Sequence, residues 1–160
     1  MRVVEKAPLI FGNVDISAVT FRKSRDDIPQ LLKGLQYIYV TPSLRKAIFT
    51  LLETEIAPEI SKKTGRPGME LWKVFVLGVM RLALNCDYDR LESLANYHAQ
   101  IRQMLGHNFG ENVVHYPIQT LKDNINLFTP TLLDKINQIV VNGGHVLVKK
   151  KEIALHGRCD

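Results

Sequence analysis

The stretch that most constrains this chain is the apolar segment 69–84, which we expect to form one helix. At 3.6 residues per turn its apolar side chains point almost all the way round the helix axis: Leu71, Trp72, Val74, Phe75, Val76, Leu77, Val79, Met80, Leu82 and Leu84. Only a narrow polar seam interrupts them, formed by Glu70, Lys73, Arg81 and Asn85. A helix that is apolar on every side has to be buried among other elements. We therefore predict that this helix is the centre of the core.

Gly78 lies in the middle of the predicted core helix. A glycine in a helix interior costs about 1 kcal/mol relative to alanine, so a packing reason for it is expected. Because helices approach most closely where a side chain is missing, we expect a second helix to cross at Gly78.

Two shorter helices are expected directly after the core helix. Asp87 is a good N-cap for a helix over residues 88–98, and a third helix over 99–105 should end at Gly106 in the left-handed conformation. Two helices joined by a tight turn, with a third packed on them, is the layout of helix-turn-helix DNA-binding units. Spacing alone leaves that function open, since most three-helix clusters bind no DNA.

The rest of the chain also predicts helices, so the expected fold class is all-α. Helices should begin at Asp26 or Asp27, at Thr41-Pro42, at Pro117 and at Thr129-Pro130, because these are capping residues or prolines suited to a first turn. Residues 1–24 are expected to be an extended leader. Gly143-Gly144 is a potential break in the last helix, and residues 153–160 have a strand-like composition.

Composition limits which cellular compartment and which class of partner we expect. A chain of 160 residues with 46% hydrophobic residues has enough material for one core. The net charge of +5 and the pI near 9.3 favour a polyanionic partner mildly. The two cysteines, Cys86 and Cys159, are far apart, which argues against a zinc site or a disulfide framework and fits a reducing cytosol. No segment predicts a membrane span, so we expect a cytoplasmic protein.

A basic loop precedes the core helix. Lys62, Lys63 and Arg66 lie within five residues, and the glycines and proline of residues 65–68 cannot continue a helix. One interpretation is a phosphate or minor-groove contact, in which an extended arginine enters a narrow groove. The other is an ordinary basic surface loop.

Three stretches resemble a known protein family. They are TGRPGMELWKVFVLGVMRLALNCDYDRLESLANYHAQIRQMLGH, FGNVDISAVTFRKSRDDIPQLLKGLQYIYVTPSLRKAIFTLLE and FTPTLLDKINQIVVNGGHVLVKKK. They are similar, in that family's order, to the N-terminal region of bacterial insertion-sequence transposases of the DDE type. The nearest likeness is to the "not classified yet" group (ISNCY), which is akin to the insertion-sequence-five family. The run 65–68 followed by the apolar helix is the most specific part.

This resemblance implies a division of the chain. Residues 1–24 would be the leader, 25–148 a helical region for DNA binding or assembly, and 149–160 a basic connector with the first strand of an RNase H-like catalytic domain. That domain uses two Asp and one Glu around divalent metal, Mg²⁺ in the full-length family. Asp160, in the context Arg158-Cys159-Asp160, would be the first catalytic and metal-binding carboxylate. Because the sequence stops there, we expect no transposition by this chain alone and no cofactor in it.

The resemblance makes DNA, in the form of transposon ends, the expected partner. Lys62, Lys63 and Arg66 would contact the backbone or the minor groove. A second set of side chains on the two helices after the core helix could contact bases or phosphates, because Asn and Gln pair with adenine and Arg with guanine: Arg90, Asn96, Gln100, Arg102 and Gln103. Three alternatives remain open: a protein–protein module that forms a homodimer, a transposition-repressing form, and a gene remnant.

Overall fold

The computed structural model describes residues 10–11, 14–21, 26–56, 69–107 and 114–155, and side chains within 14–143 of that set. The described part is almost entirely helical, as the sequence predicted, with seven α-helices. A two-stranded antiparallel hairpin precedes them, made of β1 (Ile10–Phe11) and β2 (Val14–Asp15) and followed by the short 3₁₀ turn η1 (Ile16–Ala18). The predicted basic loop, with Lys62, Lys63 and Arg66, lies outside the described residues, and so does Asp160.

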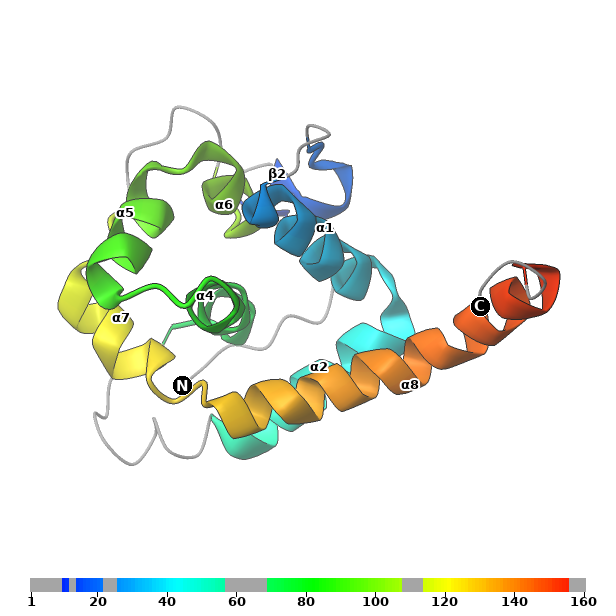
Figure 1. The fold of residues 1–160 in the computed structure, drawn as a ribbon. Coiled ribbons are helices and arrows are strands. Elements are labelled where there is room, and N and C mark those ends of the chain that lie inside the picture. The colour runs from blue at the N-terminus through cyan, green and yellow to red at the C-terminus, as the bar shows by residue number, and fades with distance from the viewer. Residues whose placement is uncertain (1–9, 12–13, 22–25, 57–68, 108–113, 156–160) are drawn as a thin grey trace.

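The core helix is confirmed as α4 (Leu71–Ala83), which runs through the middle of the molecule (Figure 1). It contacts α1, α2, α5 and α7. Every residue from Leu71 to Met80 except Lys73 is buried, which is what an apolar surface on all sides requires. Trp72 anchors this helix, because its ring packs edge-on against Tyr39, Phe49 and Phe75 and its indole nitrogen donates a 2.7 Å hydrogen bond to the Met104 carbonyl.

Two helices precede α4 and form one side of the core. Helix α1 (Asp27–Val40) buries Leu32, Leu35, Ile38 and Tyr39. Helix α2 (Pro42–Glu55) begins with proline in its first turn, as predicted, and buries Leu44, Ile48, Phe49 and Leu52. The hairpin and η1 are held against α1 by the Gln36 amide, which donates to the carbonyls of Ile16 at 2.9 Å and Val19 at 2.7 Å.

The helices after α4 also begin and end close to the predicted residues. Helix α5 (Tyr88–Tyr97) is capped by the Asp87 carboxylate, which accepts from the Arg90 backbone N–H at 2.8 Å. Helix α6 (Ala99–Met104) follows immediately, and Gly106 has a φ of 94°, the left-handed conformation expected there. Helix α7 (Ile118–Ile125) then packs against α4 and α5.

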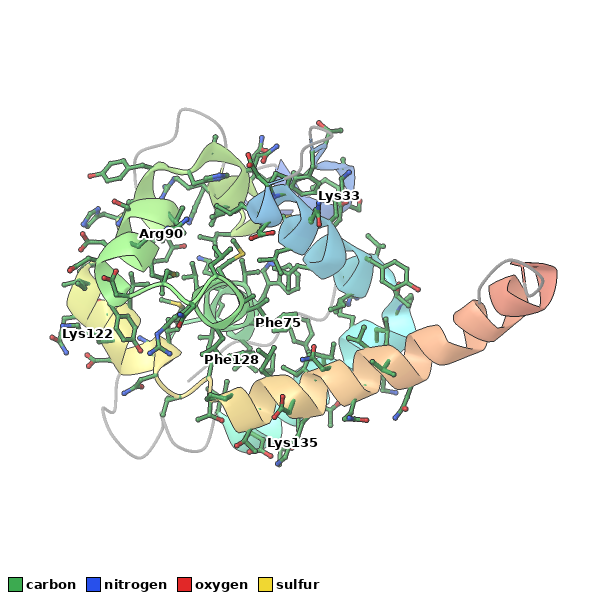
Figure 2. The ribbon with its side chains drawn as sticks, in the orientation of Figure 1. Lys33, Phe75, Arg90, Lys122, Phe128 and Lys135 are labelled. Carbon is green, nitrogen blue, oxygen red and sulfur yellow. The ribbon has the colours of Figure 1, made fainter. Side chains whose placement is uncertain are left out.

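The close neighbour of Gly78 differs from the prediction. A Cβ placed on Gly78 would lie 2.4 Å from Cγ of Phe128, so the space is taken by an aromatic ring rather than by a crossing helix. Phe128 follows α7, is fully buried and also packs against Phe75 at 6.2 Å between ring centroids (Figure 2). The sequence showed that something had to approach Gly78 but not which element.

The last helix, α8 (Pro130–Leu155), corrects two predictions. Gly143-Gly144 does not break this helix. Gly143 lies against α2, where a Cβ would come within 2.7 Å of the Leu44 side chain, so a residue without a side chain fits there. Residues 153–155 are helical rather than the start of a strand. The ion pair of Lys135 with Glu55 and the contact of Gly143 with Leu44 together show that α8 runs antiparallel to α2. The end of α8 extends past the helical body (Figure 1).

None of the helices in the described part of the chain has the length and the apolar run that a bilayer-spanning helix requires.

Candidate nucleic-acid interface

One face of α5 presents a row of exposed side chains. Arg90, Ser93 and Tyr97 are three and four residues apart, so they lie one above the other on the helix surface. The opposite face is fixed by the fully buried Leu91 and Ala95. Tyr97 is 78% exposed, which is unusual for so large a ring and leaves it free to stack on a partner.

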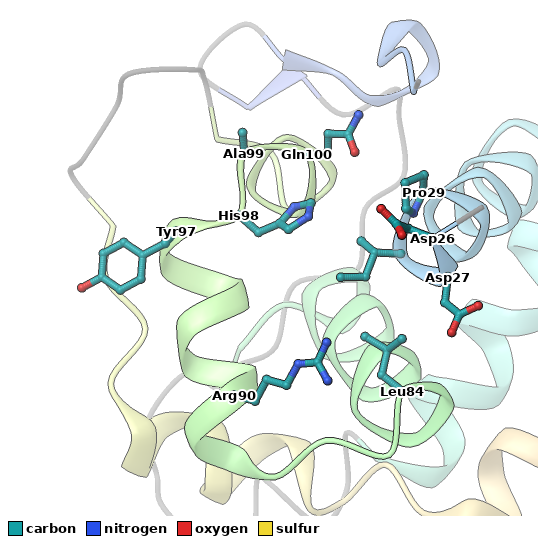
Figure 3. Close-up of a pocket in the computed structure, with 10 residues that line it drawn as sticks. Asp26, Asp27, Pro29, Leu84, Arg90, Tyr97, His98, Ala99 and Gln100 are labelled. Carbon is teal, nitrogen blue, oxygen red and sulfur yellow. The ribbon is translucent and has the colours of Figure 1, made fainter. Parts of the chain in front are cut away.

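A cleft of about 1000 Å³ lies between this part of α5, the beginning of α6 and the first turn of α1 (Figure 3). The Arg90 side chain extends from α5 into the cleft, and the His98 ring extends into it from the joint between α5 and α6. The complete lining is Asp26, Asp27, Ile28, Pro29, Leu84, Arg90, Tyr97, His98, Ala99 and Gln100. A volume of this size is at the upper end of small-molecule pockets.

The two walls of the cleft differ in charge. On the α1 wall the exposed Asp26 carboxylate points into the cleft and the exposed Asp27 carboxylate points away from it, whereas the α5 wall carries the Arg90 guanidinium (Figure 3). Asp26 occupies the N-cap position of α1 without a side-chain capping hydrogen bond. Ile28 and Leu84 add apolar surface between the walls.

His98 has a structural role at this joint. Its Nδ1 accepts a 3.3 Å hydrogen bond from the Ile101 backbone N–H and so caps α6. Burial lowers the pKa of His98 below its usual 6.5, because the charged ring would be poorly solvated. The ring in the cleft is therefore neutral near pH 7.

Asn96, a predicted DNA contact, makes hydrogen bonds within the protein. Its amide nitrogen donates to the carbonyls of Glu92 and Tyr116, each at 2.9 Å, and its amide oxygen accepts from the Tyr116 N–H at 2.7 Å. The side chain is half-buried. Asn96 thus holds the segment that enters α7 against α5.

Arg102, another predicted contact, makes similar internal bonds. One guanidinium nitrogen donates to the Ala95 carbonyl and another to the Val114 carbonyl, both at 2.9 Å. Together with the Asn96 amide, these bonds fix residues 114–116. A base contact by either residue would first have to break them, so we leave both out of the interface.

The other predicted contacts fall into two groups. Arg90 and Gln100 line the same cleft although they come from different helices. Gln103 is half-buried on α6 and does not line that cleft. Sequence reasoning missed four residues that line the cleft: Asp26 and Asp27, which it interpreted only as helix starts, and Tyr97 and His98.

The positive charge of the chain is unevenly distributed. Among the described side chains, acidic residues outnumber basic ones: Asp15, Asp26, Asp27, Glu53, Glu55, Glu70, Asp87, Asp89, Glu92, Asp123 and Asp134 against Lys33, Arg45, Lys46, Lys73, Arg81, Arg90, Arg102, Lys122 and Lys135. The net charge of +5 therefore comes from the other parts of the sequence, including Arg22, Lys23, Lys62, Lys63, Arg66 and residues 149–151. The described side chains alone therefore do not account for the positive charge that favours a polyanionic partner.

Comparisons of the chain with protein-family models, curated proteins and solved structures found no match. The transposase resemblance therefore stays a prediction from the sequence.

Proposed function

We propose that this chain is the helical DNA-binding region of a DDE-type transposase and recognises transposon ends. The proposal rests on the exposed row of Arg90, Ser93 and Tyr97 on α5. Helix α5 packs against the buried α4, and Gln100 on α6 lines the same cleft as Arg90 and Tyr97. Arginine and amide side chains, such as those of Arg90 and Gln100, are the types that can bond base edges. In this proposal α4, α5 and α6 form a helix-turn-helix-like unit, with α5 presenting the contact face.

The charge distribution suggests that two sets of residues contact DNA in different ways. Arg90 and Gln100 would contribute sequence preference, and Lys62, Lys63 and Arg66 would supply the phosphate contacts that the net-acidic helical body lacks. Binding should therefore depend strongly on salt, because each neutralised phosphate releases counterions.

The experiment starts from a duplex selected from a random library by the full chain, with affinity measured by fluorescence anisotropy. Arg90→Ala combined with Gln100→Ala should weaken the selected duplex about tenfold or more and reduce its advantage over a scrambled duplex. Lys122→Ala on α7, an exposed cation that does not line the cleft, is the matched control and should change affinity little. Equal affinities for selected and scrambled duplex, in the unchanged protein, would refute sequence recognition.

A triple Ala substitution of Lys62, Lys63 and Arg66 tests the second set. If each contacts a phosphate, the slope of log affinity against log salt should fall by about 0.9 for each residue. An unchanged slope would assign the phosphate contacts elsewhere.

A second candidate function, assembly of two copies, is favoured by α8. This helix continues to Leu155, past the point where Gly143 contacts Leu44 on α2. Val141, two residues before Gly143, is 58% exposed. Light scattering with and without the selected duplex separates the two functions. A stable dimer that is indifferent to DNA would favour assembly.

A further inference from the structure

We propose that the exposed side of α1 receives the projecting end of α8 from a second copy of this chain, so that two copies form a reciprocal pair with two such contacts. This inference gives the second candidate function, assembly of two copies, a defined surface, and it does not depend on DNA binding. It follows from an uncovered glycine and exposed apolar side chains on α1, together with a helix end that leaves the body at the same corner.

Gly34 lies in the interior of α1 and faces open space. A Cβ on Gly34 would meet no atom of the described residues within 4 Å. The Cβ positions of Gly78 and Gly143, in contrast, are occupied by other side chains. A glycine inside a helix costs about 1 kcal/mol relative to alanine. Since a missing side chain lets another helix approach closely, Gly34 marks a place where a partner helix fits.

Exposed apolar side chains continue from Gly34 to the end of α1. Tyr37 and Val40 follow Gly34 at intervals of three residues, so all three lie on one side of the helix. Tyr37 is 44% exposed and Val40 is 47% exposed. Apolar side chains that gather on a surface mark an interaction site, whereas single ones are ordinary.

The end of α8 leaves the helical body close to this surface. Gly143 of α8 contacts Leu44 of α2, which follows Val40 of α1 by four residues. Residues 144–155 continue α8 past the body for about 18 Å, at 1.5 Å per residue (Figure 1). A lone helix of this length is marginal in water, because few hydrogen bonds offset the cost of its first turn. A surface that covers this end therefore stabilises it.

The two surfaces match in order when the helices run in opposite directions. Along α8, residues 146–148 are apolar and residues 149–151 are lysines. Along α1, read from its end towards its start, the exposed Val40 and Tyr37 come first and the exposed carboxylate of Asp27 comes last. Apolar residues thus meet apolar residues, and lysines meet an aspartate.

A second copy is the occupant that this arrangement favours, because each copy carries both surfaces. The α8 end of one copy contacts α1 of its partner while the partner's α8 end makes the same contact in return, as two-fold symmetry requires. Doubling a short helix contact brings the buried area closer to the ~800 Å² per partner that stable complexes bury.

The first test measures assembly of the full chain by sedimentation equilibrium. Gly34→Gln should raise the dimer dissociation constant about tenfold or more, because a long side chain fills the space for the partner helix. Val40→Glu should weaken assembly as well. Val114→Glu, on a valine that is 40% exposed outside α1, is the matched control and should leave the dimer unchanged. Circular dichroism checks that each variant keeps its helices.

Charge reversal tests the pairing of the two surfaces. Asp27→Lys should weaken assembly about fivefold or more, and so should glutamate at residues 149–151. The two changes combined should restore assembly, because the opposite charges meet again. Asp89→Lys, in the first turn of α5, is the matched control and should neither weaken assembly nor rescue the glutamate variant. Lys33→Glu, on the exposed side of α1, should tighten assembly.

The outcomes separate this surface from assembly in general. A dimer that tolerates both Gly34→Gln and Asp27→Lys would overturn the α1 surface and place assembly on another face. A dimer weakened by Gly34→Gln but not restored by the combined charge reversal would overturn the α8 end as the occupant. A chain that is monomeric at every concentration would overturn both this proposal and the second candidate function. None of these results changes the DNA-binding proposal, which the anisotropy measurements test separately.

Discussion

The ring of Phe128 occupies the space that Gly78 leaves open on α4. A Cβ on Gly78 would lie 2.4 Å from Cγ, 2.6 Å from Cδ1 and 2.8 Å from Cβ of Phe128, all closer than real contacts allow. Because Phe128 is fully buried between the end of α7 and the start of α8, its ring has no free direction in which to move. This contact adds to the packing of α7 on α4 in holding the C-terminal helices to the core helix.

Gly78→Ala is therefore expected to destabilise the protein. Overpacking of this kind costs about 1–3 kcal/mol, which exceeds the gain of up to about 1 kcal/mol from better helix propensity. Gly34→Ala on α1 is the matched control, because a Cβ there meets nothing within 4 Å. It should stabilise the protein by up to about 1 kcal/mol. Urea unfolding measures both, and equal stabilisation by the two substitutions would contradict the contact.

Replacing Trp72 by phenylalanine should cost about 1–3 kcal/mol. The indole N–H donates to the Met104 carbonyl in a buried site, and phenylalanine would remove that donor as well as part of the ring. Thermal unfolding followed by circular dichroism measures the loss. Tyr97→Phe, on a side chain that is 78% exposed, should change stability by less than about 0.5 kcal/mol. A Trp72→Phe protein as stable as the original would show that this hydrogen bond is not needed.

Asn96→Ala should release the segment that enters α7. The substitution removes two donated bonds and one accepted bond, and we expect a loss of about 1–3 kcal/mol because the Tyr116 backbone groups lose their partner. Hydrogen exchange at the Tyr116 amide should accelerate. Asn137→Ala, an exposed asparagine on α8, should leave that exchange rate unchanged. Unaltered protection in Asn96→Ala would show that other contacts hold the segment.

The capping histidine should make stability depend on pH. Because burial lowers the pKa of His98 in the folded protein, the unfolded chain takes up a proton more readily. The stability that the neutral His98 ring contributes is fully present above about pH 6.5 and is lost as the pH falls below that value. His98→Asn keeps an acceptor suited to an N-cap but cannot titrate, so its stability should decline less between pH 7.5 and pH 5.5. An identical decline in His98→Asn would contradict the prediction.

The sequence by itself determined the secondary structure and the centre of the core. The ring of apolar residues on α4 leaves it no solvent-facing side, and Asp87, Pro42 and Gly106 place helix ends through local hydrogen bonds and backbone preferences. These are short-range effects, and so they can be recognised from residue types and spacing alone. The end of α8 was predicted wrongly for the same reason, since strand-like composition says nothing about whether a partner strand is present.

The tertiary structure decided which polar residues are available to a partner. Arg90 and Arg102 look equivalent in the sequence, yet Arg90 extends into a cleft whereas Arg102 is bonded to two backbone carbonyls. Likewise, Asp26 lines the same cleft as Arg90 only because α1 packs beside α6 and α4. Such pairings join residues distant in the chain, and they depend on how helices pack rather than on local preference, so no spacing pattern could have given them.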